Sequence, residues 1–414
     1  MLMDPDAFRI AWPQVVRALA VVTRSLDRGE ECAAEAFARA ASRPDGSIDD
    51  LTAWCVHVGR RVWLDGVRHE AVLARLMPDV ARAETTTMDD APARPGDALD
   101  DRLALLFVAC DDALAPGAQL VLAMRVVCGL SIRQIASHLG IAEATAAARL
   151  TRAKSGLARA RGEFAVPGPA ERETRLPTVL ACVAGLFSVG QREALQPADA
   201  TEDPARDALV LAEALVAEFP GDPEALGLRA VCRLGLARRP ARVRGGVALP
   251  LDEVDRTGWD ARLLRAGLGD VAAAVALTDR PGRFVLEAAI SGAHSTSPDA
   301  DGTDWDRLAQ LYDALLAVWP SPATRVARLV VLGRLCLADT GTGAADAAGL
   351  TEIERELEEL VADGPPYAAR DASLALADLA RRTGRADEAA ARYRELIDVV
   401  PEGPLREFCR RHAG

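Results

Sequence analysis

Residues 129–161 carry the pattern of two helices joined by a tight turn. Ser131 is a good N-cap for the first helix, whose apolar residues recur at helical spacing. Gly140 can adopt the positive φ that a sharp helix-to-helix turn needs. We expect the second helix to start near Glu143. It offers four polar side chains to a DNA groove or to phosphates: Thr145, Arg149, Arg152 and Lys154.

This hairpin is basic in a chain that is otherwise acidic. Residues 125–161 contain seven Arg or Lys residues and one acid, whereas the whole chain has a net charge of −12. A locally basic helix is the electrostatic signature of DNA contact. An ordinary helical hairpin with a solvated basic face remains the alternative, because helix–turn–helix geometry has many mimics.

Composition favours an all-α protein. Half of the 414 residues are hydrophobic and only 4% are aromatic, and the length predicts two to four domains. The eight cysteines and five histidines are dispersed, so we expect no metal site and no cofactor. Walker, GxSxG, HExxH and dinucleotide-binding motifs are missing, which argues against an enzyme. Neither a signal peptide nor a membrane span is recognisable, so we expect a cytoplasmic protein without membrane contact.

Pro- and Gly-rich breaks divide the chain. Residues 1–77 are expected to form three or four helices, the third at about 51–76, and residues 100–163 a compact four-helix unit that ends with the hairpin. Between them, residues 78–99 predict an extended acidic linker. A second linker at 164–175 precedes a helical domain at 176–414.

The C-terminal domain shows helical pairs. In residues 372–401, Ala389 and Tyr393 followed by Pro401 have the spacing of a tetratricopeptide second helix. Weaker copies lie at 205–239 and 305–337. The pattern predicts an α-solenoid-like domain that binds a peptide or partner on its concave face. A plain helical bundle is the alternative.

One segment of this domain, residues 243–254, breaks the helical rhythm, and Gly245–Gly246 predicts a hairpin turn within it. Charged and aromatic residues surround the segment. A salt-bridged elaboration that fixes a long loop would explain them; the alternative is a groove for an anionic ligand or a partner tail. A hidden hydrolase or transferase would also have to use this neighbourhood. The candidate groove residues are Arg238, Arg239, Arg242, Asp255, Arg256, Trp259, His294, Asp304 and Trp305.

Residues from 100 onward, including LFVACDDALAPGAQLVLAMRVVCGLSIRQIASHLGIAEATAAARLTRAKSGLARAR, resemble region 4 of the extracytoplasmic-function (ECF) sigma factors of the sigma-70 family. The preceding EECAAEAFARA and AWCVHVGRRVWLDGVRH are similar to their region 2. The downstream LARRPARV, LDEVDRTGWD and LEAAISGAH resemble the C-terminal domain of the subgroup with a tetratricopeptide-like extension. The resemblance thus covers nearly the whole chain.

The resemblance implies roles for particular residues. The second hairpin helix would enter the major groove of the −35 element through Thr145, Arg149, Arg152 and Lys154. The third helix would engage the −10 element through Trp54, Arg60, Arg61 and Arg68. Core RNA polymerase would be bound through Glu31, Glu35 and Phe37, and the acidic linker would enter the RNA channel of the polymerase.

The sequence therefore predicts a sigma factor that binds core RNA polymerase, recognises −10 and −35 promoter DNA, and is regulated in cis by its C-terminal domain. The alternative is a degenerate, sigma-like scaffold that binds protein partners through its solenoid and has lost promoter activity.

Overall fold

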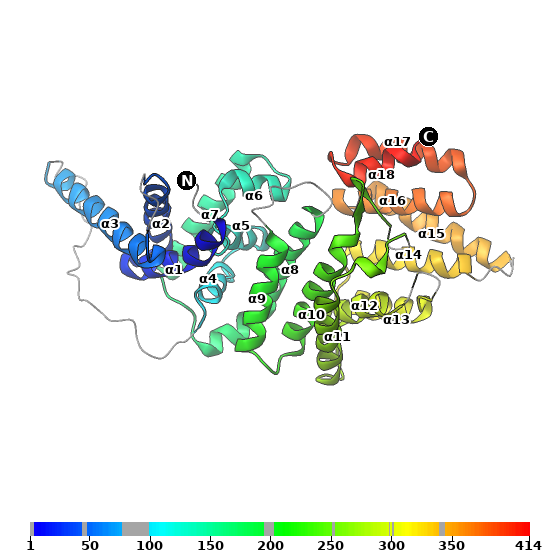
Figure 1. Ribbon diagram of the computed structural model, residues 1–414, viewed down its shortest axis with the longest axis horizontal. Coiled ribbons are helices and arrows are strands. Elements are labelled where there is room, and N and C mark those ends of the chain that lie inside the picture. Colours follow the sequence, from blue (N-terminus) through cyan, green and yellow to red (C-terminus); the bar gives the residue numbers. More distant parts are fainter. Residues whose placement is uncertain are drawn as a thin grey trace. The chain divides into compact units, whose positions relative to one another are not determined.

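A computed structural model describes residues 4–43, 48–76, 99–193, 203–250, 253–297, 299, 302–338 and 344–414. These residues form eighteen α-helices, two short 3-10 helices and one two-stranded hairpin (Figure 1). The all-α prediction is confirmed. The acidic linker expected at 78–99 lies outside the described residues, except for Leu99.

The chain divides into two compact units, residues 1–186 and 187–414. The division falls within α8 (Pro169–Glu193), a continuous helix. Because α8 starts at Pro169, the second half of the segment expected to be a linker at 164–175 is helical.

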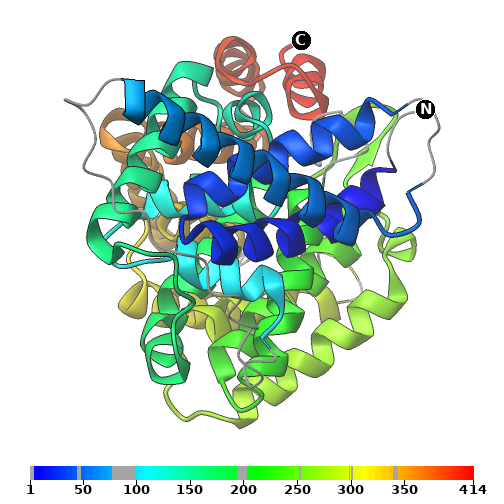
Figure 2. The same ribbon diagram turned by 90° about the vertical axis from the view of Figure 1, so that its left-hand side faces the viewer.

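The first three helices of unit 1 are α1 (Pro5–Thr23), α2 (Leu26–Ala41) and α3 (Leu51–Leu76). Each packs on the other two, and Figure 2 shows these blue helices lying next to one another. A Cβ at Gly29 would lie 2.5 Å from the backbone nitrogen of Ala20, so only glycine permits this approach of α2 to α1. The helix predicted at about 51–76 is confirmed. Ser25 caps α2, because its hydroxyl accepts from the N–H of Arg28.

The next four helices are α4 (Asp101–Ala109), α5 (Pro116–Val126), α6 (Ile132–Leu139) and α7 (Glu143–Arg161). α5 packs on α4, α6 and α7. Fully buried apolar side chains fill the space between these helices, which gives the hairpin of α6 and α7 a rigid support. They include Leu103, Phe107, Leu122, Met124 and Ile135.

Unit 2 continues as helices that pack on their neighbours in the chain. In addition, α10 packs on α12 and α14 on α16, as expected for stacked helical pairs. The pairs predicted at 205–239, 305–337 and 372–401 all form. The helices are α9 (Pro204–Glu218), α10 (Pro223–Arg238), α11 (Ala261–Ala276), α12 (Arg283–Thr296), α13 (Trp305–Val318), α14 (Pro322–Ala338), α15 (Ala344–Asp363), α16 (Pro366–Arg382), α17 (Ala386–Val399) and α18 (Pro404–His412).

The irregular segment of unit 2 forms a hairpin of β1 (Val243–Arg244) and β2 (Val247–Ala248). Gly245 and Gly246 have φ of 57° and 77°, as a two-residue turn of this hand requires, so the predicted turn is confirmed. Both residues of β2 are buried in one apolar cluster with Tyr393 and Phe408. The hairpin therefore connects the segment after α10 to the last helices of the chain.

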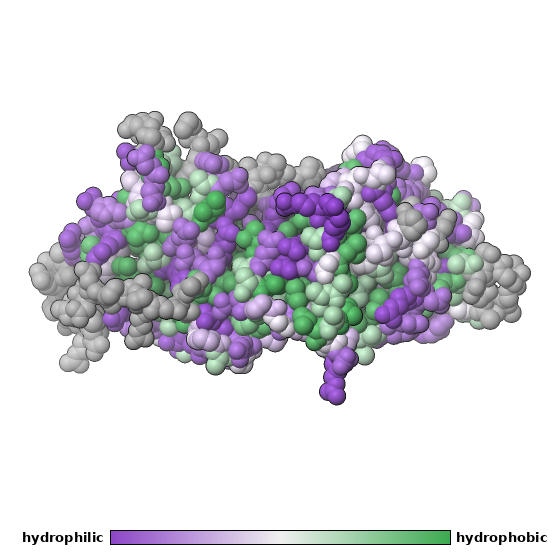
Figure 3. All heavy atoms as spheres, turned by 60° about the horizontal axis from the view of Figure 1, so that its bottom comes forward, coloured by the Kyte–Doolittle hydropathy of each residue, from purple (hydrophilic) through white to green (hydrophobic). Residues whose placement is uncertain are grey.

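The helix surfaces are mixed in polarity. Figure 3 shows hydrophobic (green) and hydrophilic (purple) side chains next to each other over one face. Within the described part of the chain, no helix is both long and apolar enough to cross a membrane. All eight cysteines are free thiols, and seven of them are buried.

Candidate nucleic-acid interface

The turn between α6 and α7 is fixed by local hydrogen bonds. Ser131 and Gln134 form a capping box, in which the Ser131 N–H donates to Oε1 of Gln134 at 2.6 Å and the Gln134 N–H donates to Oγ of Ser131 at 3.3 Å. Gly140 ends α6 with φ of 64°, and its N–H donates to the carbonyls of Ala136 and Ser137. These contacts confirm the predicted hairpin and set the direction of α7.

One face of α7 is open to solvent. A helix turns by about 100° per residue, so Thr145, Arg149 and Arg152 lie on one stripe. Thr145 and Arg152 are exposed and Arg149 is half-buried. The opposite stripe packs on α5 and α6 through Leu150 and Leu157. The structure thus brings together three of the four residues predicted to contact the −35 element.

Lys154 lies on the other side of α7. It is nine residues from Thr145, which is half a turn away on a helix. Its ammonium contacts carboxylate oxygens of Asp27 and Glu30, both at 2.6 Å, and its side chain is 12% exposed. Burial by itself would lower the pKa of Lys154, but the charges and hydrogen bonds of Glu30 and Asp27 raise that pKa above its usual value.

Glu30 is the centre of a charged junction within unit 1. It is 3% exposed and pairs with Lys154 of α7 and with Arg125 of α5, the latter at 2.5 Å. The junction therefore joins α2 to the helices of the hairpin unit. The sequence does not single out Glu30 or Arg125. A charged residue on a helix has the same local pattern whether it faces solvent or a partner helix.

Three further contacts support the same junction. The Trp12 indole N–H donates to the carbonyl of Arg125 at 3.2 Å. Arg17 donates to the carbonyl of Leu99 and pairs with Asp101 at 2.8 Å. These bonds connect α1 to α4 and α5, so residues 5–76 and 99–161 form one body in this structure.

Three of the four α3 residues predicted to engage the −10 element lie on one face of the helix. Trp54, Arg61 and Arg68 are seven residues apart and share one stripe of the helix, whereas Arg60 lies about 100° away. Trp54 is half-buried beneath the guanidinium of Arg43, 5.6 Å from its ring centroid. Arg60, Arg61 and Arg68 are exposed, and Arg68 pairs with Asp65 at 3.2 Å.

The residues predicted to bind polymerase do not share one environment. Glu31 and Glu35 are exposed on α2, and Glu35 pairs with Arg39 at 2.8 Å. Phe37 is 3% exposed and packs edge-on against Phe8, with ring centroids 5.0 Å apart. In this fold Phe37 supports α2 from inside and does not present its ring to a partner.

In unit 2, several candidate groove residues gather at the C-terminal end of α12. Arg238 donates to the carbonyl and hydroxyl of Ser291 at 3.1 and 2.9 Å. Arg256 donates to the carbonyl of His294 at 3.2 Å and to that of Ser297. The Arg256 guanidinium satisfies carbonyls that the helix end leaves unpaired, and both guanidinium groups suit the negative end of the helix dipole.

Two aromatic residues complete this cluster. Trp259 is 7% exposed beneath Arg256, and Trp305 lies edge-on to His294 with ring centroids 6.2 Å apart. Burial, with the charges of Arg238 and Arg256, lowers the pKa of His294 to about 4. The His294 imidazole is therefore neutral near pH 7, and its packing against Trp305 stabilises this cluster.

Four candidate groove residues remain, and three of them make local contacts. Arg239 pairs with Asp203 at 2.8 Å, which ties the end of α10 to the start of α9. Asp255 caps the 3-10 helix at 256–258, and Asp304 caps α13. The Arg242 guanidinium has no hydrogen-bond partner among the described residues. In the described part of the chain, no group of three or more His, Cys, Asp or Glu side chains could hold a metal ion.

Comparison with known proteins separates the chain into two matched parts. Residues 106–157 match the family described as Sigma-70, region 4, and residues 175–275 match a family of unknown function, DUF6596. The first part contains α5, α6 and nearly all of α7. The second contains most of α8 and the segment through α11.

Two relatives extend this result. Uncharacterized protein R00370 of Rhizobium meliloti (strain 1021) is 33% identical over 333 residues, which cover 78% of each chain. Probable ECF RNA polymerase sigma factor SigI of Mycobacterium tuberculosis (strain ATCC 25618 / H37Rv) is 27% identical over 184 residues, covering 44% of this chain and 63% of that protein. No solved structure matches the chain.

The helix–turn–helix unit and its match define the class of this part of the chain: residues 106–157 form a sigma-70 region 4 domain, and the chain is similar to a probable ECF sigma factor. Within that class it belongs to one family with the rhizobial protein R00370. The first part of its C-terminal extension, residues 175–275, matches the DUF6596 family.

Proposed function

We propose that this protein is a sigma factor of the ECF type that binds core RNA polymerase and directs it to promoters with −10 and −35 elements. The observation that carries the proposal is the exposed stripe of Thr145, Arg149 and Arg152 on the second helix of a region 4 hairpin. A helix held this way can enter a major groove, and its arginines can contact bases or phosphates. Such a protein would work in the cytoplasm.

Promoter recognition requires unit 1 to open. The −10 and −35 elements are separate stretches of promoter DNA, whereas α2 and α7 contact each other through Lys154. The 22 residues 78–99 could span at most about 75 Å when extended. We therefore assign 1–77 and 100–163 as separable region 2 and region 4 domains joined by a long linker.

The C-terminal domain is proposed to regulate the sigma domains in cis. Its consecutive helical pairs, with contacts between α10 and α12 and between α14 and α16, support a tetratricopeptide-like stack. Stacks of this kind commonly bind a peptide or a protein partner. Deletion of residues 187–414 should change promoter-dependent output, and identical output under all conditions would remove this part of the proposal.

Run-off transcription with purified core polymerase and genomic fragments tests the main proposal. We expect start sites that depend on the protein, and a severalfold drop in their transcripts in Arg149→Ala. Arg262→Ala is the matched control, because Arg262 is an exposed arginine of unit 2.

A pull-down of core polymerase separates the alternative. A degenerate scaffold would leave the polymerase unbound and would give no protein-dependent start sites. Polymerase retention without any promoter-dependent transcript would also contradict the proposal.

A further inference from the structure

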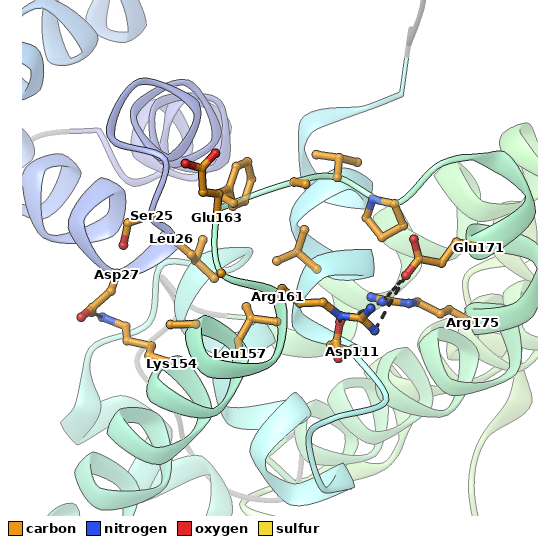
Figure 4. A pocket seen from close by; sticks show the side chains of 17 residues that line it. Ser25, Leu26, Asp27, Asp111, Lys154, Leu157, Arg161, Glu163, Glu171 and Arg175 are labelled. Atoms are coloured by element: carbon orange, nitrogen blue, oxygen red, sulfur yellow. Dashed lines mark hydrogen bonds and ion pairs between the residues drawn. The ribbon is translucent and has the colours of Figure 1, made fainter. Parts of the chain in front are cut away.

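A cavity of about 270 Å³ lies inside unit 1, where five segments of the chain meet. The wall is formed by the start of α2, the end of α4, the last turns of α7, the segment 162–168 and the start of α8. Figure 4 shows side chains from these segments around the opening. The lining belongs to none of the surfaces predicted to contact DNA, apart from Lys154.

Every cation at this cavity is already bonded to carboxylates. Arg161 pairs with Asp111 at 2.7 Å, and Arg175 pairs with Asp111 at 2.8 Å and with Glu171. Lys154 is held by Asp27 and Glu30. An anionic ligand would therefore have to compete with buried carboxylates for each of the three donors, which is unfavourable in a site of low dielectric.

Carboxylate oxygens remain accessible. The lining contains four carboxylates and three cations, which leaves one negative charge in excess. Asp27 pairs with Lys154, Glu163 with Arg24 at 3.2 Å, and Glu171 with Arg175. These three side chains are nevertheless 51%, 69% and 45% exposed, and a carboxylate has about four acceptor positions, so each can accept a further hydrogen bond. A cation entering the cavity would find acceptors that are not fully used.

Apolar side chains form the rest of the wall. Those of Leu26 and Leu157 lie on one side and are largely buried. Phe164, Val166 and Pro167 come from the segment that crosses between α7 and α8. Its position is fixed by the Phe164 N–H, which donates to the carbonyl of Arg24 at 2.9 Å. A ligand with an apolar body would lose its hydration shell against these groups, as small-molecule sites require.

We propose that this cavity binds a small organic cation with an apolar body, such as an arylalkylamine, and that the bound cation holds α2 against α7. The first half concerns the cavity alone. The second half rests on the proposed function, because it makes the ligand a regulator of the opening that promoter recognition requires.

The coupling follows from where the cavity lies. Its wall includes Asp27 of α2 and Lys154 of α7, which separate when the regions open. A ligand that binds the closed arrangement and not the open one shifts the equilibrium by RT ln(1 + [L]/Kd). At a ligand concentration one hundred times the Kd, the ratio of closed to open protein rises about one hundredfold.

Three compounds with the same carbon skeleton test the binding site. Isothermal titration calorimetry of the full-length protein would compare 2-phenylethylamine, 2-phenylethanol and phenylacetate. We expect the amine to bind at least tenfold more tightly than the alcohol and the carboxylate not to bind. Equal affinities for all three, or tighter binding of phenylacetate, would overturn the proposal.

Two variants place the binding in the cavity. Ala158 lines it, so Ala158→Phe should fill part of the space and weaken amine binding at least tenfold. Glu163→Gln, at an exposed residue, should weaken the amine severalfold and leave the alcohol unaffected. Glu173→Gln is the matched control, because Glu173 is an exposed acid of α8 outside the lining. Amine binding that neither Ala158→Phe nor Glu163→Gln changes would place the ligand elsewhere and refute the proposal.

Hydrogen exchange tests the coupling. The amine should slow exchange of backbone amides in both α2 and α7 of the wild-type protein, and unchanged exchange at saturating amine would remove the second half of the proposal. The calorimetric result does not depend on polymerase. Failure of the pull-down with positive calorimetry would therefore reject the sigma-factor function and leave the cation site standing.

Discussion

The junction in unit 1 contains a buried ion-pair cluster beside apolar contacts such as that of Phe8 with Gly129, and it can be compared with the helix stack of unit 2. At the junction, α2 meets α5 and α7 through the buried charge of Glu30. In the stack, α10 meets α12 at Gly227, where a Cβ would lie 2.6 Å from the backbone carbon of Phe284. Ion pairs respond to salt, pH and competing ligands, whereas close backbone packing does not. We therefore expect the contacts of Glu30 to respond to salt and pH more strongly than the close backbone contact at Gly227.

Unit 2 also contains a buried carboxylate, but it does not weaken this contrast. Asp270 of α11 binds Arg229 at 2.7 Å and Arg233 at 2.8 Å. Both arginines come from α10, which is packed along α11 by apolar residues as well. The ion pairs therefore reinforce a contact that apolar packing already makes. At the junction of unit 1, charges connect the two regions that the proposed function requires to separate.

The largest effect is expected from Glu30→Gln. Loss of this charge leaves Arg125 and Lys154 facing each other, and breaking a buried pair costs about 3 kcal/mol. The closed form of unit 1 should become less stable, which urea unfolding and faster hydrogen exchange in α2 and α7 would detect. Glu31→Gln is the control, because Glu31 is exposed on the same helix. Equal behaviour of the two variants would contradict the role of Glu30.

Gly227→Ala should lower the free energy of unfolding by about 2 kcal/mol, a smaller effect than that of Glu30→Gln. The added methyl group would meet backbone atoms of α12, which cannot move aside without separating the helices. Gly269→Ala is the control: Gly269 is also helical, and a Cβ there meets nothing within 4 Å, so that variant should be stabilised. The difference would be measured by urea unfolding at 1 M salt and at low salt. If the stability lost in Gly227→Ala depended strongly on salt concentration, the proposed difference between the two regions would be wrong.

The two sides of α7 should respond differently to charge removal. Arg149→Ala should weaken binding to −35 DNA by about 1 kcal/mol and reduce the dependence of log K on log salt by about 1. Lys154→Gln should mainly loosen the junction, because its ammonium is bound to Asp27 and Glu30. Fluorescence anisotropy over a salt series, with hydrogen exchange in parallel, would compare them. Identical profiles for both variants would show that the opposite placement of these residues has no consequence.

The smallest expected effect is a loss of stability of unit 1 at low pH. Burial would raise the pKa of Asp111, but hydrogen bonds from Arg161 and the Ala113 N–H, with the charge of Arg175, outweigh it and lower that pKa below its usual value. A carboxyl with a lowered pKa stabilises the fold above its unfolded-state pKa, about 3.9, and loses this contribution as pH falls through the folded-state pKa. Unit 1 should therefore lose stability below about pH 4. The free energy of unfolding measured from pH 7 to pH 3 checks this. In Asp111→Asn, this free energy should fall less between pH 4 and pH 3 than in the wild-type protein.

Local signals in the sequence were enough for many elements. Ser131, Gly140 and the change of pattern near Glu143 determined both helices of the hairpin, because caps and turns depend on residues a few positions apart. The same holds for α3 and for the turn at Gly245 and Gly246. One available signal was missed: the nine-residue spacing from Thr145 to Lys154 already puts them on opposite faces of a helix.

The functional meaning of the charged residues needed the tertiary structure. Lys154 and Glu30 are 124 positions apart, and no periodicity links them. A lysine on a basic helix has the same local pattern whether it faces DNA, solvent or a carboxylate. The sequence by itself determined the helices of the hairpin and the class of domain that contains them. Only the fold decided which charges are buried against each other, because the free energy of an ion pair depends on distance and desolvation, and both are set by packing between distant segments.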